Sequence, residues 1–352
     1  MPRPGDLRVA VIGAGAFGRN HLRVYRELQT AGQSVELAAV VDADAKVAAG
    51  AGTAYGVPWF TSVEECLAAV RLDAASVCVP TLHHAVAAEL LLAAGVDVLV
   101  EKPLAGSLAD ADRILEAAQR YGRIVQAGHL ERFNPAVTAA WKYLNRPMFF
   151  ESHRLSVFTP RSLDVDVVLD LMIHDLDIVL SLVGSEVREV RAVGLPVLSK
   201  KVDIANVRLE FENGCIANFT ASRVSTERVR KLRFFQPHQY FSLDFARQDL
   251  LMIDVTAAAG LDVSQLAALA QMAGPAGEPQ AQGGQQHPSV GLSLKKVPVE
   301  TGEPLRVEIE SFLEVVRGRT VPVVSGADGR AALGLALEIH AAMAAHASRA
   351  GL

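Results

Sequence analysis

The sequence contains few cysteines, and the ones present do not form a recognisable set. Cys66, Cys78 and Cys215 are odd in number, lie far apart and include no C-x-x-C pair. Disulfide frameworks and cysteine-based zinc sites need paired or closely spaced cysteines. The sequence therefore predicts neither of these, and it favours a reducing compartment.

An excess of charge of one sign is also lacking. The 352 residues include 34 Lys and Arg against 39 Asp and Glu, which gives a formal net charge of -5. Dedicated nucleic-acid binders and polybasic membrane anchors carry an excess of basic residues. We therefore expect no nucleic-acid partner. A small polar or anionic substrate stays open, because a local basic pocket does not require a basic protein.

Long apolar runs are lacking as well, although half of the residues are hydrophobic. No run approaches the roughly 18 apolar residues of a membrane-spanning helix. The first residues, "MPRPGDLRVAVIGAG", reach glycine too soon to supply the apolar region of a signal peptide. We expect a soluble cytoplasmic protein without a membrane partner, long enough for two domains with separate cores.

The first part of the chain alternates short β-branched runs with Ala- and Leu-rich helical stretches. This alternation predicts an α/β domain, a Rossmann-type doubly wound parallel sheet, over residues 1–129. The candidate strands are "RVAVIG", "VELAAVVD", "AASVCVP", "VDVLVEKP" and "RIVQAG".

The rhythm changes after Gly128. A helix is expected near "NPAVTAAWKYL", where Asn134 is a good N-cap and Pro135 suits the first helical position. Longer strand-like runs follow, with a hairpin turn predicted at Asn213-Gly214. Residues 130–352 are therefore predicted to form an α+β domain with a large, mostly antiparallel open sheet. Residues 257–291 are rich in Ala, Gly and Gln, and we interpret them as a flexible insertion.

A glycine motif follows the first predicted strand directly. "VAVIGAGAFGRNH" has Gly13, Gly15 and Gly18 in G-x-G-x-x-G spacing, with Ala16 and Phe17 inside the loop. Such glycines permit a tight turn, close approach of a pyrophosphate and close packing of helix on strand, and the helix N-terminus attracts phosphate. The alternative is a glycine-rich turn without a ligand.

Asp42 makes that alternative less favourable. It ends the second predicted strand, where an acidic side chain can accept hydrogen bonds from the ribose hydroxyls of a dinucleotide. A 2'-phosphate there would meet a like charge, with Asp44 nearby and only Lys46 to offset it. The sequence therefore favours NAD as the cofactor over NADP.

Two further strand ends carry polar residues. "VDVLVEKPLAG" ends in Glu101, Lys102 and Pro103, and a lysine at the carboxyl end of such a strand is well placed to reach the nicotinamide. Pro103 confines Lys102 to an extended backbone, and a cis bond between them is conceivable. The alternative is a solvated Glu-Lys pair. In "CVPTLHHA", Thr81 and His84 are candidates to line the same crevice, although an exposed loop histidine is an equally ordinary reading.

The segment "VLDLMIHDLD" introduces carboxylates and a histidine into an apolar stretch. Read as a helix from about Asp166, it places Asp166, Asp170, His174 and Asp177 on one face. This polar stripe predicts either a catalytic cleft or a structural cluster of satisfied side chains. A metal shared by an Asp and a His at i and i+4 is the weakest reading, since no third ligand accompanies them, and we predict no metal.

Taken together, these motifs resemble the Gfo/Idh/MocA family of oxidoreductases. The resemblance rests on the glycine motif with Asp42, the Pro80-Thr81-x-x-His84 element, Glu101-Lys102-Pro103 and Asp170-x-x-x-His174, and it covers nearly the whole chain apart from 257–291. It implies an NAD-dependent sugar dehydrogenase that is a homodimer or homotetramer through its C-terminal sheet. It also implies roles for three residues: His174 accepts the hydroxyl proton, Asp170 orients His174 or binds a neighbouring hydroxyl, and Lys102 polarises the oxygen. The cofactor residues that it implies are Gly13, Gly15, Ala16, Phe17, Gly18, Asp42, Pro80, Thr81, His84, Glu101 and Lys102.

Within that family, three segments resemble the UDP-N-acetylglucosamine 3-dehydrogenases: 127–137, 151–183 and 203–225. This resemblance implies a UDP-sugar substrate, a 3-keto product and a pyridoxal-phosphate aminotransferase that aminates it for lipid A biosynthesis. From the residues alone, arginines can hold a diphosphate, so the candidate substrate residues, besides Asp170 and His174, are Arg132, His153, Arg154 and Arg161. The alternative for His153, Arg154 and Arg161 is an ordinary surface charge, and for the stretch around Arg132 it is helix capping by Asn134.

Two other functions are compatible with the same motifs. One is a family dehydrogenase that acts on a free sugar or inositol. The other is a non-catalytic NAD-binding regulator on the same fold. The combined presence of Lys102, Asp170 and His174 argues against a regulator, which needs no proton acceptor beside the nicotinamide.

Overall fold

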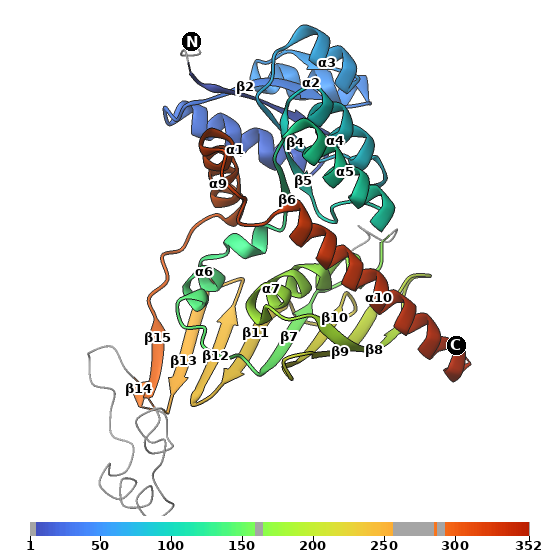
Figure 1. The fold of residues 1–352 in the computed structure, drawn as a ribbon, viewed down its shortest axis with the longest axis vertical. Helices are drawn as coiled ribbons and strands as arrows, with labels where there is room; N and C mark the ends of the chain where they lie inside the picture. The colour runs from blue at the N-terminus through green and yellow to red at the C-terminus, as the bar shows by residue number, and fades with distance from the viewer. Residues whose placement is uncertain (1–4, 159–164, 256–284, 287–292, 352) are drawn as a thin grey trace, which may run out of the picture. The chain divides into compact units, whose positions relative to one another are not determined.

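The computed structural model describes residues 5–158, 165–255, 285–286 and 293–351. The chain divides into two compact units, each built around its own sheet (Figure 1). The first unit comprises Met1–Phe133 and Glu303–Leu335, and the second comprises Asn134–Gly302 and Ala336–Leu352.

The sheet of the first unit is parallel and has six strands in the order β3-β2-β1-β4-β5-β6. This is the predicted doubly wound Rossmann order, which is confirmed. The direction of winding reverses between β1 and β4, and in such sheets ligands bind there, beyond the carboxyl ends of the strands. The strands are β1 (Leu7–Ile12), β2 (Val35–Val41), β3 (Trp59–Phe60), β4 (Ala74–Val77), β5 (Asp97–Glu101) and β6 (Val125–Gly128).

Helices connect these strands, and their ends follow ordinary capping rules. Helix α5 begins after Ser107, whose hydroxyl accepts the Asp110 N–H, and ends at Gly122 with φ of +60°. The elements are α1 (Gly18–Thr30), α2 (Ala45–Tyr55), α3 (Val63–Ala69), α4 (His84–Ala93), α5 (Leu108–Tyr121) and the short 3-10 helices η1 (Thr81–His83) and η2 (Leu130–Phe133).

A helix from much later in the chain completes the first unit. Helix α9 (Pro304–Gly318) buries Ile309, Phe312 and Leu313 in one cluster with Leu22 of α1 and Val9 of β1. The observed division therefore differs from the predicted one, which assigned all of 130–352 to the second domain. An apolar helix stripe shows that a helix is buried but not which core receives it.

The second unit contains a sheet of nine strands in the order β14-β15-β13-β12-β11-β7-β10-β9-β8. Among the described strands of this second sheet, only β7 and β10 pair in parallel, so the predicted, mostly antiparallel sheet is confirmed. The hairpin between β9 and β10 turns at Gly214, with φ of +82°, as predicted. The strands are β7 (Phe149–Leu155), β8 (Val187–Leu195), β9 (Ile204–Phe211), β10 (Ile216–Ser222), β11 (Val229–Gln236), β12 (Gln239–Asp244), β13 (Asp249–Asp254), β14 (Gln285–Gln286) and β15 (Ser293–Val297).

Helices α6 and α7 lie on one face of this sheet (Figure 1). Helix α6 (Pro135–Trp141) starts as predicted, with the Asn134 side chain accepting the Ala136 N–H. A π-helical turn, η3 (Val168–Met172), leads directly into α7 (Ile173–Val183), and α10 (Gly326–Ala350) ends the chain. Apart from Gln285–Gln286, the predicted insertion at 257–291 lies outside the described residues.

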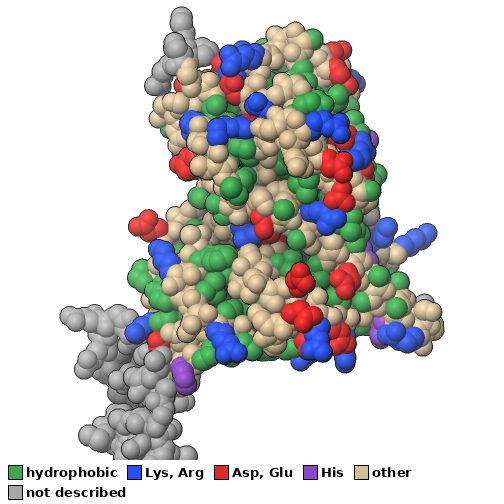
Figure 2. Space-filling model, viewed as in Figure 1, with side chains coloured by type: hydrophobic (Ala, Val, Ile, Leu, Met, Phe, Trp, Pro, Cys, Tyr) green, Lys and Arg blue, Asp and Glu red, His purple; other side chains and the backbone are tan. Residues whose placement is uncertain are grey.

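Acidic and basic side chains are interspersed on the face of the molecule seen in Figure 2, over both units. This mixture agrees with the small net charge of -5. Among the helices that the structure describes, none combines the length and the apolar character that a bilayer crossing requires.

Candidate active site

The glycine loop after β1 has the geometry that the G-x-G-x-x-G spacing predicts. Gly13 has a φ of +94°, and a Cβ added there would lie 2.7 Å from the Cys78 backbone. A Cβ on Gly18 would lie 1.8 Å from the Gly13 carbonyl oxygen, whereas one on Gly15 would have no atom within 4 Å. The outer glycines therefore allow a tight turn and close packing, and Gly15 leaves its backbone open to a ligand. Ala16 and Phe17 are exposed beside it.

Asp42 closes this loop from the end of β2. Its Oδ2 accepts the Ala14 N–H at 2.8 Å and its Oδ1 accepts the Asp44 N–H at 2.9 Å. The carboxylate remains partly exposed. It can therefore hold the glycine loop in place and still accept hydrogen bonds from ribose hydroxyls, so the loop and Asp42 together fit a dinucleotide.

At the end of β5, the neighbouring residues Glu101 and Lys102 were both predicted to bind the cofactor, but they have different surroundings. Lys102 is half-buried and precedes a cis peptide bond to Pro103. Glu101 is buried: its Oε1 lies 2.9 Å from His21 Nε2, and its Oε2 accepts the Lys102 N–H at 3.3 Å. The prediction that Glu101 binds the cofactor is therefore not supported, because its carboxylate is occupied by groups of the protein itself.

The strand end at β4 shows a similar difference. Pro80 is exposed and Thr81 is half-buried, but His84 is buried. His84 Nδ1 lies 3.0 Å from the Pro103 carbonyl oxygen, and Nε2 lies 2.9 Å from that of Val79. Burial lowers the pKa of His84 more than these carbonyls raise it. His84 thus ties the loops after β4 and β5 together instead of lining the crevice as predicted.

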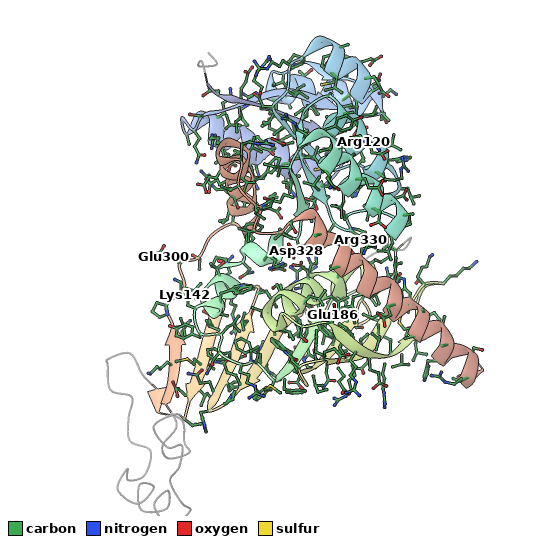
Figure 3. The ribbon with its side chains drawn as sticks, viewed as in Figure 1. Arg120, Lys142, Glu186, Glu300, Asp328 and Arg330 are labelled. Atoms are coloured by element: carbon green, nitrogen blue, oxygen red, sulfur yellow. The ribbon has the colours of Figure 1, made fainter. Side chains whose placement is uncertain are left out.

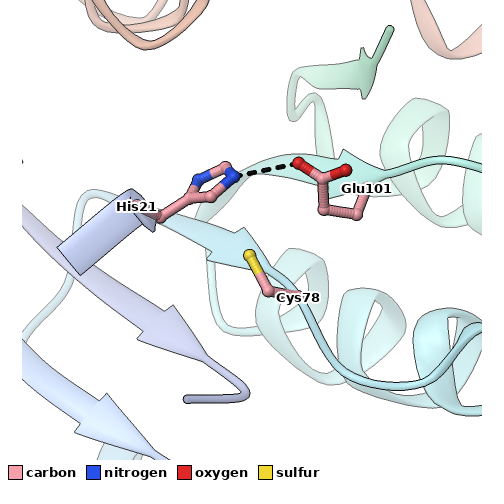
Figure 4. A group of neighbouring side chains, drawn as sticks. All are labelled: His21, Cys78 and Glu101. Carbon is pink, nitrogen blue, oxygen red and sulfur yellow. Dashed lines mark hydrogen bonds and ion pairs between the residues drawn. The ribbon is translucent and has the colours of Figure 1, made fainter. Parts of the chain in front are cut away.

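A polar cluster that the sequence motifs did not predict lies near this edge of the sheet (Figure 4). His21, Cys78 and Glu101 bring potential ligand atoms within 4.8 Å of one another, and they are the only such His, Cys, Asp and Glu group in the described part of the chain. Both His21 nitrogens, however, already lie at hydrogen-bonding distance from Ser76 and Glu101. Burial also raises the pKa of the Cys78 thiol well above its usual range, which favours the neutral thiol. The cluster fits a hydrogen-bond network better than a metal site.

One sequence signal does mark His21. It lies on the face of α1 that contains the buried Gly18, Leu22 and Tyr25. A histidine on the core-facing stripe of an amphipathic helix needs polar partners inside the protein, so its position already predicts such a network.

The polar segment of the second unit is not one regular helix. Asp166 precedes it, and its Oδ1 accepts the N–H groups of Val168 and Leu169 and lies 3.0 Å from His340 Nε2. Asp170 lies in the π-helical turn, and His174 lies in the first turn of α7; both are half-buried. π-helical turns frequently occur at functional sites. Asp166 is therefore a cap, and a catalytic role of Asp170 and His174 stays a prediction.

The predicted substrate residues around β7 do not converge. Arg154 is buried and forms a bidentate ion pair with Asp175 of α7. Because side chains alternate along a strand, His153 faces the opposite side of the sheet from Arg154, α7 and His174. The Arg154 guanidinium thus has a partner within the protein, and substrate binding by His153 or Arg154 stays a prediction. Arg161 lies outside the described residues.

Arg132 lies in η2 and is also buried. Its Nη2 is 3.7 Å from Oδ1 of Asp328, which lies in the first turn of α10 (Figure 3). Asp328 accepts the Ser325 N–H and hydroxyl, so it also caps that helix. Arg132 thus has a structural partner, and a role in substrate binding stays a prediction.

Two family models match the chain. Residues 7–129 match the oxidoreductase family with an NAD-binding Rossmann fold, GFO/IDH/MocA. Residues 123–236 match the GFO/IDH/MocA C-terminal domain.

Among curated relatives, a UDP-N-acetylglucosamine 3-dehydrogenase from Acidithiobacillus ferrooxidans is 33% identical over 97% of this chain and 99% of its own length. An inositol 2-dehydrogenase from Leifsonia xyli is also 33% identical, but over 54% of this chain and 57% of its own length.

Solved structures show the same similarity. The UDP-N-acetylglucosamine 3-dehydrogenase from Acidithiobacillus ferrooxidans has a TM-score of 0.82 and 32% identity, covering 97% of this chain and 98% of that one. An oxidoreductase from Agrobacterium radiobacter in complex with NAD+, L-tartaric acid and magnesium has a TM-score of 0.77 over 96% of each chain. At 18% identity, that likeness concerns the fold alone.

Proposed function

Because the chain belongs to the Gfo/Idh/MocA family of NAD-binding oxidoreductases, which act on CH–OH groups, we propose that it oxidises the 3-hydroxyl of UDP-N-acetylglucosamine with NAD. The observation that carries this substrate is the extent of the similarity. The nucleotide-sugar enzyme matches essentially end to end, whereas the inositol dehydrogenase matches about half of either chain.

The first unit would hold the cofactor. Gly13, Gly15 and Gly18 would let the pyrophosphate approach the start of α1, and the exposed Ala16 and Phe17 would border it. Pro80 and Thr81 would line the crevice beyond β4. Asp42 would bind the adenosine ribose, and its charge would disfavour a 2'-phosphate, which is why we propose NAD and not NADP. When bound, NAD supplies the hydride acceptor.

The chemistry on the substrate is assigned to three side chains. His174 would accept the proton of the hydroxyl group, since imidazole exchanges protons near neutral pH. Asp170, in the turn before it, would orient the imidazole or bind a neighbouring hydroxyl. Lys102 would stabilise negative charge on the oxygen. Lys102 belongs to the first unit and the other two to the second, so their action on one carbon is part of the proposal.

The same proposal extends to the surroundings of the enzyme. A second copy of the chain would associate through the open sheet of the second unit, as a homodimer or homotetramer. The 3-keto product would be the substrate of a pyridoxal-phosphate aminotransferase.

The test is turnover followed at the NADH absorbance band, with a carbonyl trap and mass detection of the product. Substrates are UDP-N-acetylglucosamine, free N-acetylglucosamine, myo-inositol and glucose. We expect turnover of the UDP-sugar alone, with kcat lower by about 10²- to 10⁴-fold in His174→Ala. His153→Ala is the matched control, because this histidine lies on the opposite face of the sheet.

Turnover of a free sugar or inositol instead would remove the nucleotide-sugar assignment and keep the catalytic residues. Tight NAD binding without any turnover would favour the non-catalytic regulator.

A further inference from the structure

The Glu101 carboxylate binds two different parts of the first unit. Its Oε1 lies 2.9 Å from His21 Nε2 on α1, and its Oε2 accepts the backbone N–H of Lys102 at 3.3 Å. Glu101 is 7% exposed and His21 is fully buried. The backbone of Lys102, whose side chain is proposed to act on the substrate, is therefore connected to α1 through one carboxylate.

His21 is itself held from its other side. Its Nδ1 lies 3.0 Å from Ser76 Oγ, and Ser76 Oγ lies 2.8 Å from the Tyr25 hydroxyl. Tyr25, Ser76, His21 and Glu101 thus form a row of hydrogen-bonded side chains. Every polar hydrogen in this row has an acceptor if the Tyr25 hydroxyl donates to Ser76, the Ser76 hydroxyl donates to His21 Nδ1, and His21 Nε2–H donates to Glu101. This arrangement would place the proton of His21 on Nε2, and the contacts on both sides of the ring restrain its orientation.

Gly128, on the neighbouring strand β6, lies close against Glu101. A Cβ on Gly128 of β6 would lie 2.9 Å from Glu101 Cα and 3.1 Å from both Cδ and Oε1. The contact with Cα is shorter than real Cβ contacts, and the contacts with Cδ and Oε1 are tighter than most of them. Gly128 therefore allows the carboxylate to lie flat against β6, where His21 and the Lys102 N–H both reach it.

We propose that His21 is a positioning residue, which fixes Lys102 through Glu101 relative to the helix that starts at the dinucleotide loop. This inference rests on the proposed function, because it concerns the placement of Lys102 for that reaction. Helix α1 begins at Gly18, directly after the glycine loop, so one rigid helix is connected to both the cofactor loop and Lys102. A misplacement of about 1 Å at a reacting group can lower a rate by about 100-fold.

A matched pair of variants separates the two contacts of His21. The amide of Gln in His21→Gln can place a donor near the position of Nε2 and reach Glu101. The shorter amide in His21→Asn can occupy the position of Nδ1 and reach only Ser76. Tyr25→Phe is the control, because it removes the far end of the row and leaves the contact between His21 and Glu101 unchanged.

The measurements are kcat and KM for the UDP-sugar, the Kd for NAD by calorimetry, and hydrogen exchange of the Lys102 amide by NMR. We expect His21→Asn to lower kcat by about tenfold or more, with the Kd for NAD changed less than about threefold, while His21→Gln and Tyr25→Phe stay within about threefold of wild type. We also expect the Lys102 amide to exchange faster in His21→Asn than in the other two variants.

Equal losses in His21→Gln and His21→Asn, or no loss in a folded His21→Asn, would overturn the inference. So would stoichiometric zinc in the purified protein that both variants lose, since His21 would then be a metal ligand. If the wild type oxidises no sugar, the proposed function fails, and the amide exchange decides alone: equal exchange in all variants would then refute the positioning role.

Discussion

Arg154 and Asp175 form a bidentate ion pair in the interior of the second unit. Arg154 Nε lies 2.9 Å from Oδ2 of Asp175, and Nη2 lies 2.7 Å from Oδ1. The guanidinium also lies over the Phe245 ring, 5.1 Å from its centroid. The pair joins β7 to α7, the helix that carries His174, so the Arg154 guanidinium is engaged by the protein itself.

Removing this arginine should destabilise the protein. Arg154→Ala leaves the Asp175 carboxylate buried and unpaired, which we expect to lower the free energy of unfolding by about 3–5 kcal/mol. Arg233→Ala is the control, because its ion pair with Glu151 is partly exposed to solvent and is worth about 0–1 kcal/mol. Urea unfolding measures both. An Arg154→Ala protein of normal stability with a raised KM for the UDP-sugar would instead restore the substrate-binding role.

The preference for NAD should depend on Asp42. In Asp42→Ser the carboxylate that would bind the ribose hydroxyls is lost, and with it the repulsion of a 2'-phosphate. We expect the KM for NAD to rise by about 10- to 100-fold, which corresponds to the loss of hydrogen bonds to a charged group. The KM for NADP should fall relative to that for NAD.

The control for this prediction is Asp44→Ser. Asp44 caps α2 by accepting the N–H groups of Lys46 and Val47, and serine is an equally good cap. Its cofactor preference should match that of the wild type. An unchanged NAD to NADP ratio in Asp42→Ser would show that this carboxylate only supports the glycine loop.

Much of the fold follows from local sequence patterns. The β-branched runs, the glycine loop and the capping residue Asn134 each specify their element within a few neighbouring residues, and the structure contains all of them. The same holds for Asp42, because the sequence interval from the glycine loop to the end of the second strand is set by one β-α-β unit.

Local sequence patterns could not predict hydrogen-bond and ion-pair partners that lie far apart in the sequence. Glu101 and His84 looked like crevice residues because they follow strands, but His21 and the carbonyls of Val79 and Pro103 bind them inside the protein. Arg154 looked free because its partner, Asp175, lies 21 residues away on another element. A strand-end position predicts which edge of the sheet a residue reaches, not whether it turns outward.

Asp203 should make stability depend on pH in the acid range. Burial raises the pKa of this carboxyl, but hydrogen bonds from Ser199 and from the amides of Val197 and Leu198 lower it by a larger amount. The pKa therefore lies below its usual range. It also pairs with Arg223 at 3.0 Å. A depressed pKa gives stability that is complete above the unfolded value of about 4 and is lost as the pH falls through the folded value.

We therefore expect Asp203→Asn to lower the free energy of unfolding at pH 7 by at least about 2 kcal/mol. The difference from wild type should shrink as the pH falls below about 4, where the carboxyl of the unfolded chain becomes protonated while that of the folded protein is still charged. Asp249→Asn, at a half-exposed ion pair with Lys296, is the control and should change little. A deficit that stays constant from pH 7 to pH 3 would mean that the charge of Asp203 contributes nothing.

The glycine loop offers a test that separates cofactor binding from folding. A Cβ on Gly15 would meet no atom within 4 Å, so Gly15→Ala should leave the stability of the cofactor-free protein within about 0.5 kcal/mol of wild type. The same methyl group would occupy the space through which the pyrophosphate approaches the backbone, and we expect the Kd for NAD to rise by about tenfold or more.

Gly18→Ala should instead lower the stability of the protein even without cofactor. Its Cβ would overlap the Gly13 carbonyl oxygen, and relieving that overlap should cost about 1–3 kcal/mol. Thermal unfolding without NAD and calorimetric titration with NAD distinguish the two variants. If Gly15→Ala binds NAD as tightly as wild type, the pyrophosphate does not lie against Gly15, and the loop serves the fold alone.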